Sequence, residues 1–338
     1  MNRRTPAEWE PQEAVWLAWP HSLETWPGRF DRMPLFFANW ARLMAETTPV
    51  RILVPESLAK GAALVLPGNR RIEWVVAPTN DSWVRDYGPT FVHDASLGGM
   101  VGIDWHYNAW GGKYPPWDDD DAAAALMCNA IDIPRIRSEL CLEGGAIETD
   151  GRGRLLTTPE CLITETRNPG WSSERVSEEL CKQMGVSEVV WLSGGGLVGD
   201  DTDGHIDQLA RFLDPENIVV AVGDDPSDPN HEPLEANYRQ LCLWGSSTEP
   251  QVQIHRLPIP ALRQIDGQRV PESYCNFLML GRERLLVPSF GQHQADDHAR
   301  SLLSDLAGGA TVEAIDCQDL IWGLGALHCA SRDQPKRL

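Results

Sequence analysis

The 338-residue chain lacks any apolar run long enough to span a membrane, and its first residues lead into tryptophan and glutamate, not into the apolar core of a signal peptide. We therefore expect a cytoplasmic protein with no membrane partner. Basic residues are scarce, because 29 Lys and Arg face 49 Asp and Glu and give a formal net charge of -20. This sign argues against nucleic acid and is compatible with steering a cationic ligand, although solubility alone would also explain it.

Closely spaced cysteines are missing too. The eight cysteines lie at positions 128, 141, 161, 181, 242, 275, 317 and 329. No two are within four residues, which excludes a zinc site of the CxxC type, and the scatter is typical of reduced cytosolic thiols. We interpret all but Cys329 as small buried hydrophobic residues. The Asp-rich run at 200–204 has the wrong ligand spacing for an EF-hand, so we predict no metal site.

The order of the expected elements recurs along the chain, each unit having a helix, a strand and then a pair of strands. The helices are expected near 34–46, 120–130, 171–185, 231–245 and 294–307. The strands that follow them are expected near 50–54, 134–140, 188–192, 252–257 and 311–315. Four strand pairs are expected at 83–92 with 100–105, 143–149 with 154–158, 204–213 with 217–222, and 273–280 with 284–288. A fifth pair would join the Cys329 segment to residues 14–19, and an extra helix and strand precede residue 77. This order predicts one α/β domain over residues 1–338, with no linker.

Four of the five pairs begin with, or closely follow, a polar side chain of catalytic type. These side chains are Asp86, Glu143, His205 and Cys329. A single cysteine with a distant histidine and acids is a candidate nucleophile. His205 and Asp207 are two residues apart, which would place both on one face of a strand. If the units pack around one axis, these positions converge on one pocket, and its carboxylates suit a cation.

Four segments resemble the signature of the agmatine deiminase family, which includes bacterial peptidylarginine deiminase relatives within the guanidine-modifying superfamily. They are NDSWVRDYGP at 80–89, NAWGGKY at 108–114, LEGG at 142–145 and DDTDGHID at 200–207. The likeness runs from Ala7 to Pro335. It implies a five-fold pseudosymmetric α/β-propeller of the pentein type. It also implies a hydrolase of polyamine metabolism and putrescine biosynthesis, which converts agmatine to N-carbamoylputrescine and ammonia through an amidino-cysteine, with no cofactor.

The resemblance also implies a role for each matching residue. Cys329 would be the nucleophile, His205 the general acid and base, Asp86 and Asp207 the partners of the guanidinium nitrogens, Glu143 an orienting group, and Trp83 part of the pocket wall. Trp110, with Tyr114, would contact a substrate ammonium by a cation–π interaction or simply pack. The sequence departs from the family pattern before Cys329, where three glycines are replaced by Gly323-Leu324-Gly325 and an expected asparagine by Ala326.

Two alternatives stay open. The same chemistry on arginine in peptides would need an open groove, and a non-catalytic binder of guanidines or polyamines is favoured only by the Gly-Leu-Gly-Ala departure. The expected partner is a small cationic guanidine, and a homodimer is left open. We interpret His328 as structural, residues 118–121 as a solvated acidic run, and most of Trp9, Trp16, Trp19 and Trp26 as core.

Overall fold

The computed structural model describes residues 3–265 and 267–337. The α-helices are α1 (Met33–Met44), α2 (Glu56–Val65), α3 (Val84–Tyr87), α4 (Ala109–Gly112), α5 (Asp118–Ala130), α6 (Pro159–Leu162), α7 (Ser173–Met184), α8 (His231–Ser247) and α9 (His293–Leu306). The 3-10 helices are η1 (Phe30–Arg32), η2 (Gly144–Ala146), η3 (Ile206–Gln208) and η4 (Leu320–Gly323). The strands are β1 (Arg3–Arg4), β2 (Gln12–Ala18), β3 (Val50–Val54), β4 (Ile72–Val76), β5 (Thr90–Asp94), β6 (Gly99–His106), β7 (Arg135–Cys141), β8 (Glu148–Thr149), β9 (Arg154–Thr157), β10 (Glu188–Trp191), β11 (Ala210–Asp214), β12 (Asn217–Val222), β13 (Gln253–Pro258), β14 (Gln264–Ile265), β15 (Gln268–Arg269), β16 (Leu278–Leu280), β17 (Arg284–Ser289), β18 (Thr311–Asp316) and β19 (Arg332–Pro335).

One strand pattern recurs in five sheets of the described chain. Each sheet contains an antiparallel pair, and a third strand lies parallel to the second member of that pair. The triplets are β5-β6-β7, β8-β9-β10, β11-β12-β13, β16-β17-β18 and β19-β2-β3. In every case a helix precedes the third strand, because parallel strands need a crossover connection. The repeated order expected from the sequence is therefore confirmed, including the inserted α2 and β4.

Helix α7 illustrates how the sequence sets an element. Val176, Leu180 and Met184 recur every four residues and are all buried, so one face of the helix packs on the core. The Ser172 side chain accepts a hydrogen bond from the amide of Arg175 at the start of the helix. Gly185 ends the helix in the left-handed conformation, with φ of 71°, which glycine adopts without strain.

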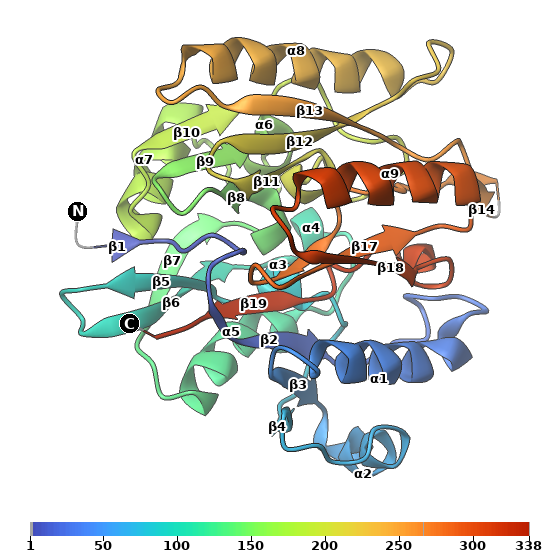
Figure 1. Ribbon diagram of the computed structural model, residues 1–338. Coiled ribbons are helices and arrows are strands. Elements are labelled where there is room, and N and C mark those ends of the chain that lie inside the picture. Colours follow the sequence, from blue (N-terminus) through green and yellow to red (C-terminus); the bar gives the residue numbers. More distant parts are fainter. Residues whose placement is uncertain (1–2, 266, 338) are drawn as a thin grey trace.

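The larger helices lie on the outer side of the strands (Figure 1). In this view α8 lies along the top edge, α7 at the left, and α1 and α2 at the bottom, while the short α3 lies near the middle. The interior holds two clusters of buried apolar residues, and the expected core tryptophans belong to the larger one, each being 5% exposed or less. None of the helices in the described ranges combines the length and hydropathy of a membrane span.

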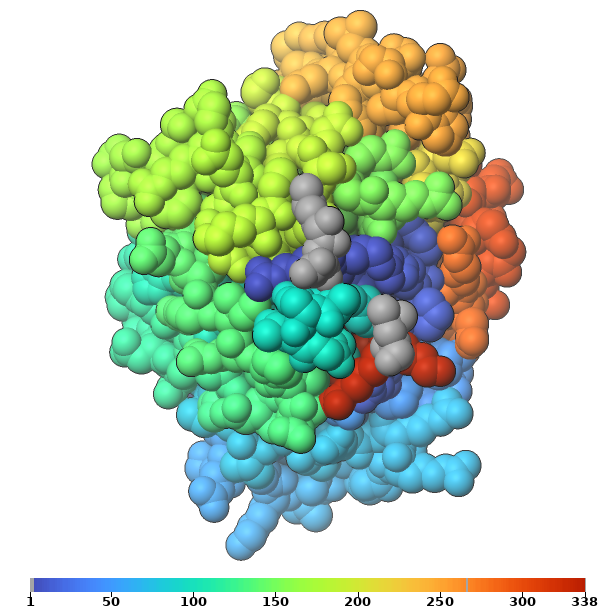
Figure 2. All heavy atoms as spheres, turned by 90° about the vertical axis from the view of Figure 1, so that its left-hand side faces the viewer, coloured from blue at the N-terminus to red at the C-terminus, as the bar shows by residue number. Residues whose placement is uncertain are grey.

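The last strand and the second strand meet in one sheet. Strand β19 pairs antiparallel with β2, so the expected partnership between residues 14–19 and the Cys329 region is confirmed. The indole N–H of Trp16 donates to Gln334 Oε1 at 2.9 Å across this pairing. Figure 2 shows dark-blue N-terminal and red C-terminal residues on the same face of the molecule. We call the β2–β19 pairing the seam.

The strand pairs start later than the sequence pattern predicts, and this is the main error in the expected elements. The residues predicted to open four of the pairs form helical turns instead: α3 before β5, η2 before β8, η3 before β11, and a turn at 327–330 before β19. His205 and Asp207 therefore do not share a strand face, and Cys329 is not on a strand. These turns are almost entirely buried, so no alternation between polar and apolar residues distinguishes them from strands.

Candidate active site

Two of these turns, α3 and residues 327–330, line a cavity of about 720 Å³. Four of the predicted site residues line it: Trp83, Asp86, Trp110 and Cys329. Glu143, His205 and Asp207 are fully buried beside Asp86 and Cys329 and complete the group. The structure thus brings together every residue that the sequence assigned to the site.

Cys329 is held by contacts on two sides. Asn276 donates a hydrogen bond from Nδ2 to the Sγ atom at 3.0 Å, and its Oδ1 accepts from the Cys329 amide at 3.2 Å. The thiol itself points at Asp207 Oδ2, 3.5 Å away. Burial, and then the charges of Asp207 and Asp86, raise the pKa of this thiol well above its ordinary value. The thiol is therefore protonated at neutral pH.

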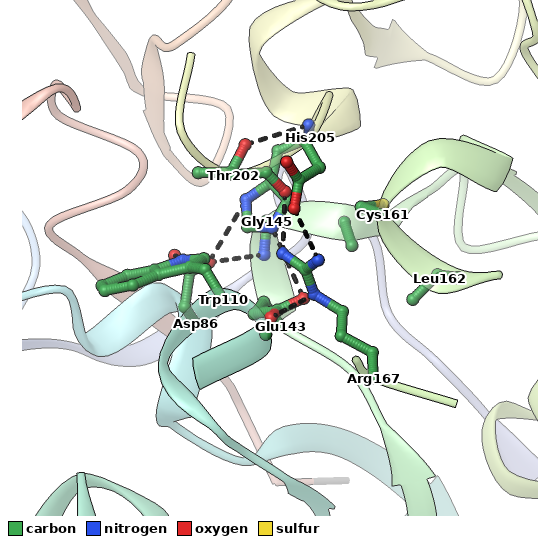
Figure 3. A network of polar contacts seen from close by, with 12 residues as sticks. Asp86, Trp110, Glu143, Gly145, Cys161, Leu162, Arg167, Thr202 and His205 are labelled. Atoms are coloured by element: carbon green, nitrogen blue, oxygen red, sulfur yellow. Dashed lines mark hydrogen bonds and ion pairs between the residues drawn. The ribbon is translucent and has the colours of Figure 1, made fainter. Parts of the chain in front are cut away.

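His205 lies between two carboxylates. Its Nδ1 is 3.7 Å from Asp86 Oδ1, and its Nε2 is 3.6 Å from Glu143 Oε2. Figure 3 shows the imidazole between these side chains, above Gly145. Burial alone would lower the pKa of His205, but Asp86, Glu143 and Asp207 outweigh burial and raise it to about 9. The imidazole is therefore cationic near neutral pH and has a proton to give.

The Asp86 carboxylate accepts hydrogen bonds from two donors, and neither donor is charged. The Gly145 amide donates to Oδ1 at 2.9 Å and the Trp110 indole donates to Oδ2 at 3.0 Å. Burial raises the pKa of Asp86 to about 6, with Asp207 and Glu143 acting in the same direction against His205. A Cβ at Gly145 would lie 2.6 Å from His205 Nδ1 and 2.8 Å from Asp86 Oδ1, so only glycine fits between them.

Arg167 anchors Glu143 and was missed in the sequence. Its Nε donates to Glu143 Oε1 at 2.7 Å, and its Nη1 donates to Asp203 Oδ2 at 2.7 Å (Figure 3). Although burial disfavours the carboxylate, Arg167 and His205 hold the pKa of Glu143 below its ordinary value. Glu143 is thus ionised and fixed next to the imidazole.

Asp207 is anchored by His328, the neighbour of the cysteine. Asp207 Oδ2 contacts His328 Nδ1 at 2.7 Å, and His328 Nε2 contacts Glu8 Oε2 at 3.0 Å. Against the effect of burial, His328 and His205 hold the pKa of Asp207 below its ordinary value. Asp207 Oδ1 is buried and has no hydrogen-bond partner within residues 3–265 and 267–337. Asp207 and His328 both lie behind Cys329 in the sense that neither is among the residues that line the cavity.

The two expected wall residues occupy different positions. Trp83 precedes α3, and its ring lies 5.6 Å from that of Trp26 at a tilt of 44°. Trp110 donates a hydrogen bond to Asp86 and lies edge-on to Tyr114 at 5.7 Å. The Tyr114 hydroxyl donates to Asp201 Oδ2 at 2.6 Å, on the outer part of the same cavity.

The acidic run at 118–121 is not the solvated stretch that the sequence indicated. Asp120 is 2% exposed and lines the cavity. It accepts hydrogen bonds from the amides of Asn80 and Asp81 at 2.7 and 3.2 Å, so the start of α5 supports the loop before Trp83. Only Asp118 is exposed in the run.

Asn276 was also missed, although the repeat could have found it. It lies in the turn before β16, the position that Asp86, Glu143 and Cys329 occupy in their own units. Arg167 has no such signal, because it lies in an irregular segment between α6 and α7. No group of histidine, cysteine and acidic residues in the described ranges is arranged to hold a metal ion.

Comparison with known proteins places this geometry in a family. The profile of the Porphyromonas-type peptidyl-arginine deiminases matches residues 4–335. One relative, from Legionella pneumophila (strain Paris), is provisionally named an agmatine deiminase. It is 33% identical to this chain over 332 residues, and the match covers 98% of this chain and 95% of the relative.

Two solved structures have the same fold over nearly the whole chain. Agmatine deiminase of Enterococcus faecalis is 30% identical, with a TM-score of 0.89 and coverage of 100% of this chain and 97% of that one. Substrate-bound agmatine deiminase of C. jejuni, with serine in place of a cysteine, is 26% identical, with a TM-score of 0.90 and coverage of 99% and 97%. The mixed α/β fold and the family-level resemblance are thus confirmed, and the chain belongs to the Porphyromonas-type peptidyl-arginine deiminase family.

Proposed function

We propose that the protein is a hydrolase that deiminates agmatine to N-carbamoylputrescine and ammonia. The charge of the cavity carries this proposal. Asp81, Asp120 and Asp201 line its outer part, and none of them has a salt bridge to a basic side chain within the described residues. Arg269 is the single arginine in the lining, and Asp228 already binds it through two contacts of 2.5 and 2.8 Å.

This charge pattern distinguishes between guanidine substrates. Burial raises the pKa of Asp81 to about 6 and raises the pKa of Asp120 well above its ordinary value, so a cation beside them would be stabilised. Agmatine is cationic at both ends. Free arginine would bring its α-carboxylate towards these acids, with no unpaired arginine in the lining to receive it. The cavity therefore favours agmatine over arginine.

The inner end of the cavity supplies the groups that the reaction needs. The guanidinium would sit between Asp86 and the free Oδ1 of Asp207, because a planar fork of N–H donors matches carboxylates. Its positive charge would offset the two carboxylates that raise the thiol pKa, so Cys329 releases its proton to solvent as substrate binds and regains one after the product leaves. The thiolate then attacks the central carbon of the guanidinium.

His205 would handle the protons of both half-reactions. As imidazolium it donates a proton to the departing nitrogen, so ammonia leaves and an amidino-cysteine remains. The neutral imidazole then removes a proton from water, whose oxygen attacks the amidino carbon and displaces the thiolate. Glu143, fixed by Arg167, would keep the ring in place, and Trp83 and Trp110 would form the walls.

Ammonia release from agmatine, free arginine and an arginine-containing peptide, measured side by side, tests this proposal. Agmatine should be preferred by orders of magnitude. A second candidate, deimination of arginine in peptides, is favoured by the family profile and by a cavity larger than a small cation needs. Equal or faster turnover of the peptide would support that candidate, and absence of turnover on all three would leave a non-catalytic guanidine binder.

The five strand triplets also support a five-fold pseudosymmetric propeller of the pentein type, formed by one domain. In this arrangement the turns before β5, β8, β11, β16 and β19 occupy equivalent positions around one axis. We also propose a cytoplasmic location, a place in putrescine biosynthesis and a homodimeric assembly. Each of these needs its own test, and light scattering tests the assembly.

A further inference from the structure

Backbone strain is concentrated at the cavity. The non-glycine residues of the described chain with positive φ are Ala109, Trp110, Asp132, Asp203 and Leu324. Aspartate tolerates this conformation, whereas alanine, tryptophan and leucine rarely adopt it. These last three all line the cavity, which means that the costly conformations of this chain lie where a ligand would bind. The strain at Trp110 has a visible use, because this residue donates its indole N–H to Asp86.

Leu324 has no such polar use. It ends η4 with φ of 67° and ψ of 12°, and its amide donates to Ile321 O at 2.9 Å. Its two neighbours are glycines with no room for a side chain, since a Cβ at Gly323 or Gly325 would lie 2.6 Å from the Trp83 ring. Glycine would also fit position 324 without strain. Within Gly323-Leu324-Gly325, Leu324 thus bears the one side chain on the cavity wall, at a position where it is unfavourable for the backbone.

We propose that Leu324 is a specificity-determining residue that packs against the methylene chain of an alkylguanidine bound to Cys329. A leucine has no polar atom to offer a guanidinium or an ammonium, so an aliphatic linker is the part of such a ligand that it can stabilise. Ile265 and Val270 line the same cavity and extend this apolar surface. The inference rests on the proposed function, because it takes the guanidinium to bind at Asp86 and Asp207.

Ligand binding to a Cys329→Ser background, measured by calorimetry, tests the role of Leu324 without requiring turnover. The probes are methylguanidinium, which lacks the linker, n-butylguanidinium, which has it, and agmatine. In Leu324→Gly and Leu324→Ala, binding of n-butylguanidinium and agmatine should weaken about three- to tenfold, as expected when one or two methylene groups lose an apolar neighbour. Methylguanidinium should bind as before.

The two substitutions separate the side chain from the strain. Both remove the leucine side chain and keep the left-handed backbone, but alanine is strained in that conformation and glycine is not. Leu324→Gly should therefore unfold at a higher temperature than Leu324→Ala. Asp132→Gly is the matched control, because Asp132 is exposed, has φ of 52° and does not line the cavity. It should change thermal stability little and leave all three affinities unchanged.

Three results would overturn the proposal. The first is unchanged n-butylguanidinium affinity in both Leu324 variants. The second is an equal loss for methylguanidinium, which would mean that the backbone near Cys329 had moved. The third is n-butylguanidinium binding no tighter than methylguanidinium before any change at Leu324. Failure of agmatine turnover in the wild type would instead count against the proposed function, and the binding comparison would still decide the role of Leu324.

Discussion

The inner and outer parts of the cavity are built in different ways. At the inner end, Asp86, Glu143, Asp207 and Cys329 come from turns that precede the first strands of repeated units, and each is fixed by at least one short polar contact. The outer part is lined by loop residues such as Asp81, Asp201 and Leu324, several of them partly exposed. The comparison teaches that the proposed reacting groups lie on the repeated architecture, whereas the residues proposed to select the substrate lie on loops, which tolerate change.

Cys329→Ser should cause the largest loss of turnover among the changes at the inner end of the cavity. The change is nearly isosteric, so folding should persist, but turnover should fall below detection because a hydroxyl is far less nucleophilic than a thiolate. Mass spectrometry of the wild type quenched during turnover should show an amidino adduct on the peptide that contains Cys329. An adduct on another of the cysteines would remove this assignment.

His205→Asn should lower kcat about 10²- to 10⁴-fold, the usual contribution of general acid–base catalysis. Asparagine keeps polarity at the site but cannot transfer a proton near neutral pH. Steady-state kinetics with agmatine provide the measurement. A variant that retains most of its kcat would show that another group handles the proton.

Asp86→Asn keeps the shape of the side chain and removes its charge. Agmatine binding in the Cys329→Ser background should weaken about ten- to a hundredfold, since a hydrogen bond to an ionised partner is worth about 1.5–3 kcal/mol. The loss should persist at high salt because the pair is desolvated. Normal binding, measured by calorimetry, would place the guanidinium on other acids.

The pH profile of kcat/KM should have two limbs. Asp86 must be ionised, so activity should fall as the pH drops through about 6; His205 must be protonated, so activity should also fall as the pH rises through about 9. Each limb should approach a tenfold loss one pH unit beyond its midpoint. Stopped assays of ammonia between about pH 5 and about pH 10 measure both, and a flat profile across pH 6 would rule out Asp86 as the acidic group.

Asp118→Asn should have the smallest effect and so sharpens the comparison. Asp118 is exposed at the start of α5, whereas Asp120, two residues later, supports the loop before Trp83. Neutralising Asp118 should change agmatine affinity less than about twofold and only at low ionic strength. A loss as large as that of Asp86→Asn would mean that the outer acids, and not the inner pair, dominate binding.

The order of the elements could be predicted from the sequence because helical and strand patterns of hydrophobic residues follow one another along the chain. The main site residues could be predicted because their motifs are distinctive. The turns could not, since Asp86, Asp207 and Cys329 lie in segments buried on every side, where no periodicity survives. The contacts of Arg167 were also out of reach, because they join an irregular segment to residues far along the chain. Long-range polar contacts of this kind leave no local pattern.

The seam has a consequence for how the molecule acquires its activity. Strand β2 and strand β19 lie more than 300 residues apart, and the turn that holds Cys329 directly precedes β19. Pairings between such distant segments form slowly, because closing a long loop costs entropy before any contact is gained. Under the proposed function, catalysis needs the Cys329 turn that this late pairing holds. We therefore predict that recovery of agmatine turnover during refolding follows complete folding and not any partly folded species.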